Sequence, residues 1–387
     1  MRICILNVIH EPFDKRVYHK IGLSLASAGH EVLSICPPPA SGEIPPLEEG
    51  RDKYGVCFIL TRSASSLPKR FLAALRLIRL AAHARADVYM APEPESWAAA
   101  LAVKLLVGGK VVLDMHEHIP SEFAKFFPAF LRGIMQRCTV HAMRLMSRFT
   151  DLIILTRESF EEPWKGLPVP RVTIINTNRL QPACSEVPEC LRARFAGHPV
   201  IIHQGIFGDV RGSYQLLDAV KLLVGDFPNL RCVVLGEYVY GSLDAYRARV
   251  RELGLDDNVV LIPPVPFGEV PAYISVAQVG LILFQPGPVN HTLAMPHKLF
   301  DYMREARPVV APEFAVEVAR IVREADCGLL VDVSKPEAIA AAVAKLLKDP
   351  REAARLGRNG RRLVVGKYNW RREEKILLDA FAALEAR

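Results

Sequence analysis

The chain lacks several features that would have identified its class at once, and the first is a long apolar run. No stretch of its 387 residues approaches the roughly 18 uninterrupted apolar residues that a membrane-spanning helix needs. The N-terminal segment resembles a short buried strand more than a signal peptide, because its brief apolar run is followed closely by Glu11 and Asp14. We therefore expect a cytoplasmic protein, and a peripheral position on the inner face of the membrane is compatible with this expectation.

Paired cysteines are also missing. The eight cysteines are scattered, mostly inside apolar runs, and none forms a C-x-x-C pair. Zinc sites and disulfide frameworks both depend on closely and regularly spaced cysteines. The sequence thus predicts reduced core cysteines, with no metal site, no disulfide and no cofactor.

A dinucleotide fingerprint is absent as well. No G-x-G-x-x-G follows any predicted strand, which disfavours a dinucleotide-dependent oxidoreductase. The formal net charge of +7 arises almost wholly in the first 180 residues, but the basic helix faces there carry no nucleic-acid recognition motif. We expect no nucleic-acid partner.

Both halves of the chain instead alternate short apolar runs with helical patterns, which is typical of parallel β-α-β units. The predicted strands are Arg2–Ile9, Glu31–Ile35, Val56–Thr61, Asp87–Met90, Lys110–Leu113, Leu152–Leu155, Val172–Ile175, Val200–Gln204, Cys232–Gly236, Val259–Ile262, Val279–Phe284, Pro308–Ala311 and Gly328–Val331. The predicted helices are Asp14–Ala28, Lys69–Ala86, Glu95–Val107, Gly212–Val224, Leu243–Leu253, Val270–Val276, His297–Glu305 and Ser334–Leu347. At this length we expect an α/β protein with two Rossmann-like, doubly wound domains.

The segments between these elements suggest how the domains are joined. Residues 37–46 form a proline-rich stretch that is predicted to be irregular, and the polar, proline-bearing segment 178–194 is the best candidate linker. The last predicted helix opens with Ser334-Lys335-Pro336-Glu337, which matches a capping box. Ligands of doubly wound sheets bind at the carboxyl ends of the strands, so we expect the site in a cleft between the two domains.

The strongest functional signal lies in the segment Met295–Phe314, MPHKLFDYMREARPVVAPEF. Lys298 and Asp301 are three positions apart and therefore share one face of a helix turn. The lysine suits a phosphate group and the carboxylate suits the two hydroxyls of a ribose, while a helix N-terminus adds free N–H groups and its positive dipole end. This pattern predicts a clamp for a nucleoside diphosphate, as a nucleotide-sugar enzyme would need.

Short sequence blocks follow one another along the second half in a recognisable order. They are Gly205 with Arg211-Gly212, Leu216 and Ala219; Val234-Leu235-Gly236; Leu253-Gly254-Leu255 with Asp257-Asn258-Val259; Pro296 with Lys298 to Met303; Pro308-Val309-Val310; and Tyr368-Asn369-Trp370. Together they resemble the motifs of the family-4 (group 1) glycosyltransferases of the GT-B fold. In the first half, the segments 10–17 and 28–32 and the block Asp114-Met115-His116-Glu117 resemble a subgroup of that family more loosely.

The resemblance implies a metal-independent glycosyltransferase that moves a sugar from a nucleotide-diphosphate donor, with UDP the expected nucleotide, to a glycan or lipid-linked acceptor. It implies retention of the anomeric configuration, an acceptor-side domain over residues 1–180 with a closing helix over 371–387 packed back onto it, and a nucleotide-sugar domain over 195–370. The candidate catalytic residues are His116, Glu117, Arg211 and Lys298. The candidate nucleotide-sugar contacts are Arg16, Gly205, Arg211, Gly236, Asn290, Lys298, Leu299 and Asp301.

The sequence departs from the family pattern near the expected donor sugar. The first glutamate of the family's Glu-x7-Glu pair is Leu293 here and the second is Asp301, so we expect Asn290 to supply the lost polar contact. An expected arginine is Ile206 and an expected glycine is Ala306, and residues 10–16 replace a glycine-rich loop. Two alternatives therefore stay open, a sugar-nucleotide epimerase and a non-catalytic nucleotide-sugar binder on the same fold.

The basic surplus of the first half falls on two predicted helix faces. One carries Lys69, Arg76, Arg79 and His83, and the other carries Arg137, His141, Arg144 and Arg148 after a run of phenylalanines between positions 123 and 130. Such faces suit an anionic membrane surface, at roughly 1 kcal/mol per cation near the lipid. They equally suit ordinary outer helices with solvated arginines.

Overall fold

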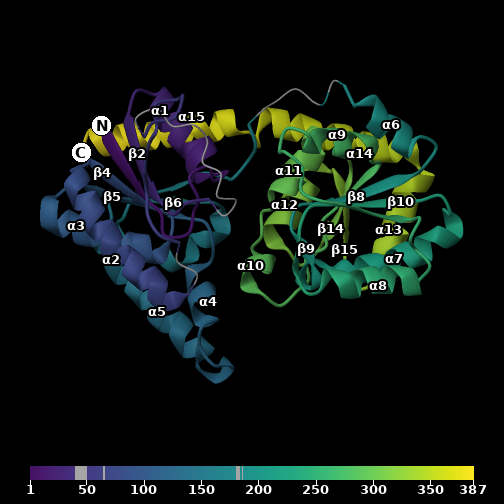
Figure 1. The fold of residues 1–387 in the computed structure, drawn as a ribbon, viewed down its shortest axis with the longest axis horizontal. Coiled ribbons are helices and arrows are strands. Elements are labelled where there is room, and N and C mark those ends of the chain that lie inside the picture. Colours follow the sequence, from purple (N-terminus) through teal and green to yellow (C-terminus); the bar gives the residue numbers. More distant parts are fainter. Residues whose placement is uncertain (40–49, 64–65, 180–183, 185) are drawn as a thin grey trace. The chain divides into compact units, whose positions relative to one another are not determined.

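The structure, a computed structural model, describes residues 1–39, 50–63, 66–179, 184 and 186–387. Residues 40–46 of the predicted irregular stretch, and residues 180–183 and 185 of the predicted linker, lie outside the described residues. The chain forms two compact units: unit 1 is Met1–Asn176 with Trp370–Arg387, and unit 2 is Thr177–Asn369. In each unit helices surround a parallel sheet (Figure 1).

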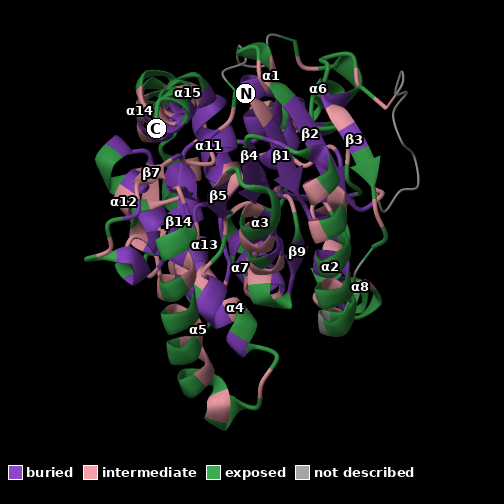
Figure 2. Ribbon diagram, turned by 90° about the vertical axis from the view of Figure 1, so that its left-hand side faces the viewer, coloured by how far each residue is buried: buried purple, intermediate pink, exposed green. Residues whose placement is uncertain are grey.

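Unit 1 is built on a seven-stranded parallel sheet in the order β3-β2-β1-β4-β5-β6-β7. Its strands are β1 (Arg2–Leu6), β2 (Glu31–Cys36), β3 (Cys57–Leu60), β4 (Val88–Ala91), β5 (Lys110–Met115), β6 (Leu152–Leu155) and β7 (Arg171–Thr173). The central strands are buried along both faces, as expected for parallel strands that are covered by helices on both sides (Figure 2). The strand order reverses between β1 and β4, so the loops after these two strands form the topological switch point of unit 1.

Helices connect the strands of unit 1. They are α1 (Leu23–Ser27), α2 (Leu67–Ala84), α3 (Pro94–Val107), α4 (Ile119–Ala124), α5 (Arg132–Met146) and α15 (Trp370–Glu385). The closing helix α15 packs on unit 1: the Trp370 indole is buried and donates from Nε1 to Ser24 Oγ at 3.0 Å, and Glu373 accepts from the Ile175 N–H at 2.6 Å.

The predicted helix over residues 14–28 differs from the structure at its start. Residues Val17–Gly22 form a π-helical turn before α1, in which the N–H groups of His19 and Ile21 donate to the carbonyls five residues earlier, those of Asp14 and Arg16. The Asp14 carboxylate accepts from the N–H groups of Arg16 and Val17 and so begins the turn. The wider turn accompanies the burial of two cationic side chains, Arg16 and Lys20, and such turns are often found at functional sites.

Unit 2 is built on a six-stranded parallel sheet in the order β12-β10-β8-β13-β14-β15. Its strands are β8 (Val200–Gln204), β10 (Arg231–Leu235), β12 (Val259–Ile262), β13 (Val279–Leu281), β14 (Val309–Pro312) and β15 (Gly328–Val331). Its helices are α6 (Glu189–Phe195), α7 (Ser213–Asp226), α8 (Leu243–Glu252), α9 (Val270–Val276), α10 (Val289–Thr292), α11 (His297–Arg304), α12 (Val316–Ala325), α13 (Pro336–Lys348) and α14 (Pro350–Gly366). The strand order reverses between β8 and β13, which makes the loop after β8 the switch point of unit 2.

Two local features of unit 2 differ from the sequence predictions. The predicted capping box at Ser334 is not formed. Lys335 is the N-cap of α13, and the Ser334 hydroxyl donates to Asp332 Oδ1 at 2.5 Å instead. A small parallel ribbon of β9 (Phe207–Gly208) and β11 (Tyr238–Tyr240) was not predicted, because strands this short leave no periodicity to detect. Within the described residues, no helix combines the length and the apolar composition needed to cross a bilayer.

Candidate functional site

Lys298 and His203 form the centre of a polar cluster in unit 2. Lys298 lies in the first turn of α11, and its Nζ is 2.9 Å from Nε2 of His203, a fully buried side chain on β8. Burial, followed by the charge of Lys298, holds the pKa of His203 well below its usual range, so the imidazole is neutral and accepts from the ammonium. Burial, followed by the charge of Arg211, lowers the pKa of Lys298 to about 7.

Arg211 brings a second positive charge to this cluster. It ends the 3-10 turn Asp209–Arg211 after β9, is half-buried, and places its guanidinium 5.8 Å from the ring centre of Tyr240. Among the described residues, neither Arg211 nor Lys298 forms an ion pair, and Arg211 Nε has no hydrogen-bond partner. Each of these two positive charges disfavours the other, and no carboxylate of the described residues forms an ion pair with either. The site therefore favours an anion.

The two candidate glycines allow the backbone to approach this cluster closely. Gly205 has a φ of +91° and Gly236 a φ of +141°, which L-residues rarely adopt. A Cβ on Gly236 would lie 2.3 Å from the Gly205 carbonyl oxygen, and a Cβ on Gly205 would meet the Lys298 side chain at 3.8 Å. Gly236 therefore allows the end of β10 to lie directly against Gly205, and the Gly205 backbone in turn borders the Lys298 side chain.

Asp301 lies one turn after Lys298 but is only 2% exposed. Its Oδ1 accepts from Asn178 Nδ2 at 2.6 Å and its Oδ2 accepts from Gln204 Nε2 at 2.9 Å. The carboxylate thus ties α11 to β8 and to the segment before α6, and a ribose would have to share oxygens that are already bonded. Its role as a ribose ligand stays a prediction.

Leu299 and Asn290 are placed differently from the charged residues of unit 2. The Leu299 side chain is fully buried and its N–H donates to the Pro296 carbonyl. Its contact with the nucleotide sugar stays a prediction. Asn290 is half-buried on the short helix α10. Its expected contact with the donor sugar stays a prediction.

In unit 1, Asp114, Arg16 and His116 form a second cluster at the end of β5. Asp114 is fully buried; it accepts from Nε and Nη2 of Arg16 at 3.0 and 2.7 Å and lies 2.5 Å from His116 Nε2. The neighbouring charges of Arg16 and His116 outweigh burial and lower the pKa of Asp114 far below its usual range. The half-buried His116 ring is therefore fixed by a carboxylate through Nε2, which leaves Nδ1 for a substrate.

Arg16 already has partners within unit 1. The side chain is 3% exposed, and its remaining donor Nη1 bonds the Ile174 carbonyl at 3.0 Å. A phosphate would have to share a guanidinium that is paired with a buried carboxylate, and the contact of Arg16 with the nucleotide sugar stays a prediction. Arg16 compensates Asp114, whereas the candidate Glu117 is exposed beside His116.

The loop that replaces a glycine-rich turn after β1 is held by Glu93. This buried carboxylate, which follows β4, accepts from the N–H groups of Val8, Ile9 and His10 at 3.0 to 3.3 Å. Successive N–H groups of this kind form a nest that binds anions such as phosphate. In unit 1 these N–H groups are already bonded to the Glu93 side chain.

Two histidines of these clusters were not singled out in the sequence. His203 is a polar residue inside the apolar strand VIIHQ, two positions before Gly205, and that interruption is the signal that could have identified it. His10 lies 5.0 Å from the His116 ring centre, and contacts with Asp14 and Glu93 raise the pKa of His10 against the effect of burial. Among the described residues, no three His, Cys, Asp or Glu side chains are grouped so that they could hold a metal ion.

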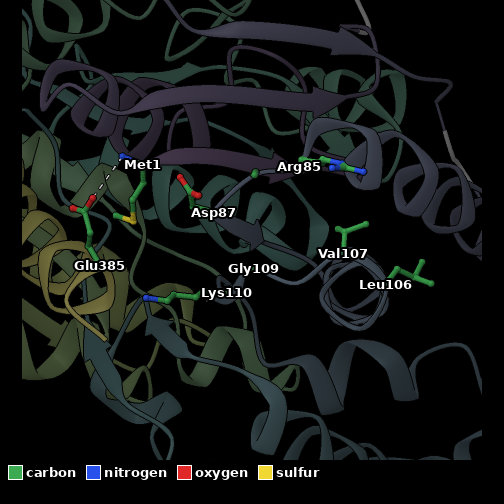
Figure 3. Close-up of a pocket in the computed structure, with 9 residues that line it drawn as sticks. Met1, Arg85, Asp87, Leu106, Val107, Gly109, Lys110 and Glu385 are labelled. Atoms are coloured by element: carbon green, nitrogen blue, oxygen red, sulfur yellow. Dashed lines mark ion pairs between the residues drawn. The ribbon is translucent and has the colours of Figure 1, made fainter.

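A cavity of about 900 Å³ lies at the opposite edge of the unit 1 sheet. Its lining comes from the segments that precede β1, β4 and β5, such as Asp87, and includes Lys110 at the start of β5 and Glu385 at the end of α15 (Figure 3). Ligands of doubly wound sheets bind at the carboxyl ends of the strands, where His116 lies, and this cavity is at the amino ends. We therefore assign neither substrate to it.

Two Rossmann-like parallel α/β units in one chain define the GT-B fold, and solved structures bear this out. Sucrose-phosphate synthase from Thermosynechococcus elongatus matches 100% of this chain and 99% of its own with a TM-score of 0.75 and 17% identity. HepE of Anabaena, solved in complex with UDP, matches 99% of this chain and 100% of its own with a TM-score of 0.73 and 13% identity. WaaG, a glycosyltransferase involved in lipopolysaccharide biosynthesis, matches 97% of this chain and 98% of its own with a TM-score of 0.69 and 14% identity.

Sequence comparison gives the family. The model of the glycosyl transferases group 1 matches residues 193–363, and the glycosyl transferase 4-like domain matches residues 15–177. The chain belongs to the group 1, GT4-like glycosyltransferases.

Two curated relatives match part of the chain. A GDP-mannose-dependent α-(1-6)-phosphatidylinositol monomannoside mannosyltransferase of Mycolicibacterium smegmatis is 25% identical over 202 residues, which are 51% of each chain. Spore coat protein SA of Bacillus subtilis is 23% identical over 190 residues, 48% of this chain and 49% of its own. The chain thus spans about half the length of the curated relatives it matches.

Proposed function

We propose that the protein transfers a sugar from a nucleotide-diphosphate donor, with UDP as the expected nucleotide, to a lipid-linked or glycan acceptor. The observation that carries the proposal is the pair of cations Lys298 and Arg211, which have no ion pair among the described residues, with the Gly205 backbone bordering the Lys298 side chain. When the glycosidic bond breaks, negative charge develops on the leaving diphosphate. Two fixed cations stabilise that charge more strongly in the transition state than in the donor, which is how such a site accelerates transfer.

The donor and the acceptor are assigned to different units. Unit 2 offers the cations, whereas the backbone nest of unit 1 is filled by Glu93. His116, oriented by Asp114, is our candidate for contact with the sugar or the acceptor, and we infer retention from family membership alone. The solved complex of HepE with UDP supports the nucleotide, and the lipid acceptor named for the mycobacterial mannosyltransferase supports a lipid-linked acceptor.

Metal-independent catalysis is part of the proposal. Lys298 and Arg211 supply the positive charge that a divalent cation would otherwise bring to the diphosphate. Transfer should accordingly persist in excess EDTA, and loss of activity that added magnesium restores would contradict this part of the proposal.

A donor panel tests the reaction type. UDP-glucose, GDP-mannose and ADP-glucose are incubated with the protein and a bacterial lipid extract, while free nucleoside diphosphate and the donor sugar are followed by chromatography. We expect release of one nucleoside diphosphate that depends on the extract. A changed sugar without nucleotide release would indicate an epimerase, and tight nucleotide binding without either change would indicate a non-catalytic binder.

A further inference from the structure

An apolar groove in unit 1 lies between the start of α3 and the helices α4 and α5. It has a volume of about 290 Å³, and its walls include Trp97, Ile119, Phe123, Met135, Met143 and Met146. Three methionines give such a wall the flexibility to adapt to chains of different shape. The walls belong wholly to described residues of unit 1.

The polar atoms in the wall of the groove are already bonded within the protein. Trp97 Nε1 donates to Thr150 Oγ1 at 2.9 Å, and the Thr139 hydroxyl donates to the Met135 carbonyl at 2.7 Å. Thr139 is therefore unable to donate to a ligand without breaking its helix contact. A sugar would lose its hydrogen bonds to water in this groove, whereas a hydrocarbon chain would gain by leaving water.

The groove begins close to the reaction site proposed for unit 1. Ile119 in its wall is three residues after His116, and three residues span at most about 10 Å. Pro94, also in the wall, directly follows Glu93, which holds the loop that carries His10. A chain in the groove would thus have its head near the ends of β4 and β5.

The outer end of the groove is aromatic and basic. Phe123 contacts Phe127 with ring centres 5.4 Å apart, and the connection to α5 exposes Phe126 (54%) and Phe130 (80%). Lys125 and Arg132 are exposed in the same connection. Figures 1 and 2 show α4 and α5 projecting from the rest of unit 1, with exposed residues along α5. Aromatic and cationic side chains together suit the headgroup region of an anionic bilayer.

We propose that this groove binds the hydrocarbon chain of an anionic lipid acceptor and so sets the head of that acceptor before His116. The inference rests on the proposed function, because it names the acceptor class of the same transfer reaction. The apolar wall and the internally bonded polar atoms favour a single hydrocarbon chain as the occupant, and the cations at the outer end favour an anionic bilayer as the source of that lipid.

Cys138 provides a direct readout, since it lines the groove and is exposed. The rate of its alkylation by N-ethylmaleimide is measured by peptide mass spectrometry in the presence of dodecyl phosphate, kept below its critical micelle concentration. Glycerol 1-phosphate, which lacks the hydrocarbon chain, is the control. Cys190, exposed on α6 of unit 2, serves as the internal reference. At ten times its dissociation constant, dodecyl phosphate should slow the reaction at Cys138 about tenfold and leave Cys190 unchanged. Equal rates with and without dodecyl phosphate, equal slowing at both cysteines, or protection by glycerol 1-phosphate would overturn the proposal.

A groove-filling variant separates this inference from the proposed function. Ala142→Trp places a large ring in the groove wall, whereas His141→Trp adds the same ring on another, exposed face of α5. Only Ala142→Trp should abolish protection of Cys138, and both variants should still be stabilised by UDP as the wild type is. If dodecyl phosphate still protects Cys138 in Ala142→Trp, the proposal that the groove binds the lipid chain is contradicted. If UDP does not stabilise the wild type, the proposed function is contradicted, and the result for the groove is unaffected.

Discussion

The ammonium of Lys298 is held against a neutral, buried imidazole and near a second cation, and this placement has a consequence for ligand binding. Its pKa of about 7 means that raising the pH above 7 removes the proton from the free site. A diphosphate bound here, as we propose, would favour the ammonium form of Lys298. Binding should therefore take up a proton at alkaline pH and weaken as the pH rises.

We predict that the dissociation constant of UDP increases by up to about tenfold between pH 7.5 and 8.5, the change that one proton per site allows. The phosphate of UDP is already ionised there, since its second pKa lies near 6. Titration calorimetry in buffers of different ionisation enthalpy should show uptake of close to one proton at pH 8.5. In Lys298→Met the residual affinity should not depend on pH, and a wild type with constant affinity and no proton uptake would contradict this account of Lys298.

Ala306 illustrates a strained residue where the family has a glycine. Its φ of +53° is in the left-handed region, which costs an L-residue roughly 1–2 kcal/mol. Ala306→Gly removes this strain. Glycine also raises the conformational entropy of the unfolded chain, which stabilises the unfolded state by about 0.4–1 kcal/mol, so the net free energy of unfolding should rise by up to about 1 kcal/mol.

Urea unfolding of the protein, followed by circular dichroism, measures this change. Ala341→Gly on the exposed face of α13 is the matched control and should lose about 1 kcal/mol, because its φ is helical. If Ala306→Gly is destabilised as much as Ala341→Gly, the left-handed conformation is not a source of strain.

At the scale of elements, the loop after β1 depends on a single carboxylate from the loop after β4. Glu93→Gln replaces acceptor oxygens that face three N–H groups with an amide that can point only one oxygen at them. We expect the free energy of unfolding of unit 1 to fall by about 2 kcal/mol. All three tryptophans, Trp97, Trp164 and Trp370, are buried in unit 1, so their fluorescence reports this unit alone.

The exposed Glu162→Gln is the control for this loop and should leave the unfolding midpoint unchanged. UDP affinity should be the same in Glu93→Gln and the wild type if the diphosphate binds unit 2. A large loss of UDP affinity in Glu93→Gln would show instead that the loop after β1 takes part in donor binding.

The elements were largely predictable, whereas side-chain roles were not. Buried strands such as β8 and β10 stand out as apolar runs between turn residues, and the spacing and motif of the α11 block made Lys298 a candidate. The pairing of Arg16 with Asp114, 98 positions away, depends on which strands become neighbours, and no local pattern encodes it. The same is true of Glu93, whose partners lie 83 to 85 positions earlier in the chain.

At the scale of the whole molecule, we consider the surface where exposed aromatic and cationic side chains of unit 1 lie together. The connection between α4 and α5 exposes Phe126 and Phe130 beside Lys125 and Arg132. We expect the protein to sediment with vesicles that contain phosphatidylglycerol, and to lose most of this binding in 0.5 M salt, where screening shortens the reach of surface charges.

The aromatic side chains should contribute to vesicle binding as well as the cations. Phe126→Ser with Phe130→Ser should reduce vesicle binding several-fold by removing apolar surface, whereas Leu105→Ser, on the equally exposed end of α3, should not. Similar losses in both proteins would mean that binding is not localised at the α4–α5 connection.

The central claim is that a nucleoside diphosphate binds the cation pair of unit 2, and thermal stabilisation tests it most directly. UDP, GDP, ADP and CMP are compared at matched concentrations on the wild type, on Lys298→Met and on Lys335→Met, an exposed lysine of the same unit. Lys298 is a better probe than Asp301, because removing the buried Asp301 carboxylate would also break two internal hydrogen bonds. At about 100 times its dissociation constant, one nucleoside diphosphate should stabilise the wild type and Lys335→Met by roughly 2.7 kcal/mol and Lys298→Met by little. Equal stabilisation of all three proteins, or of none, would contradict the claim.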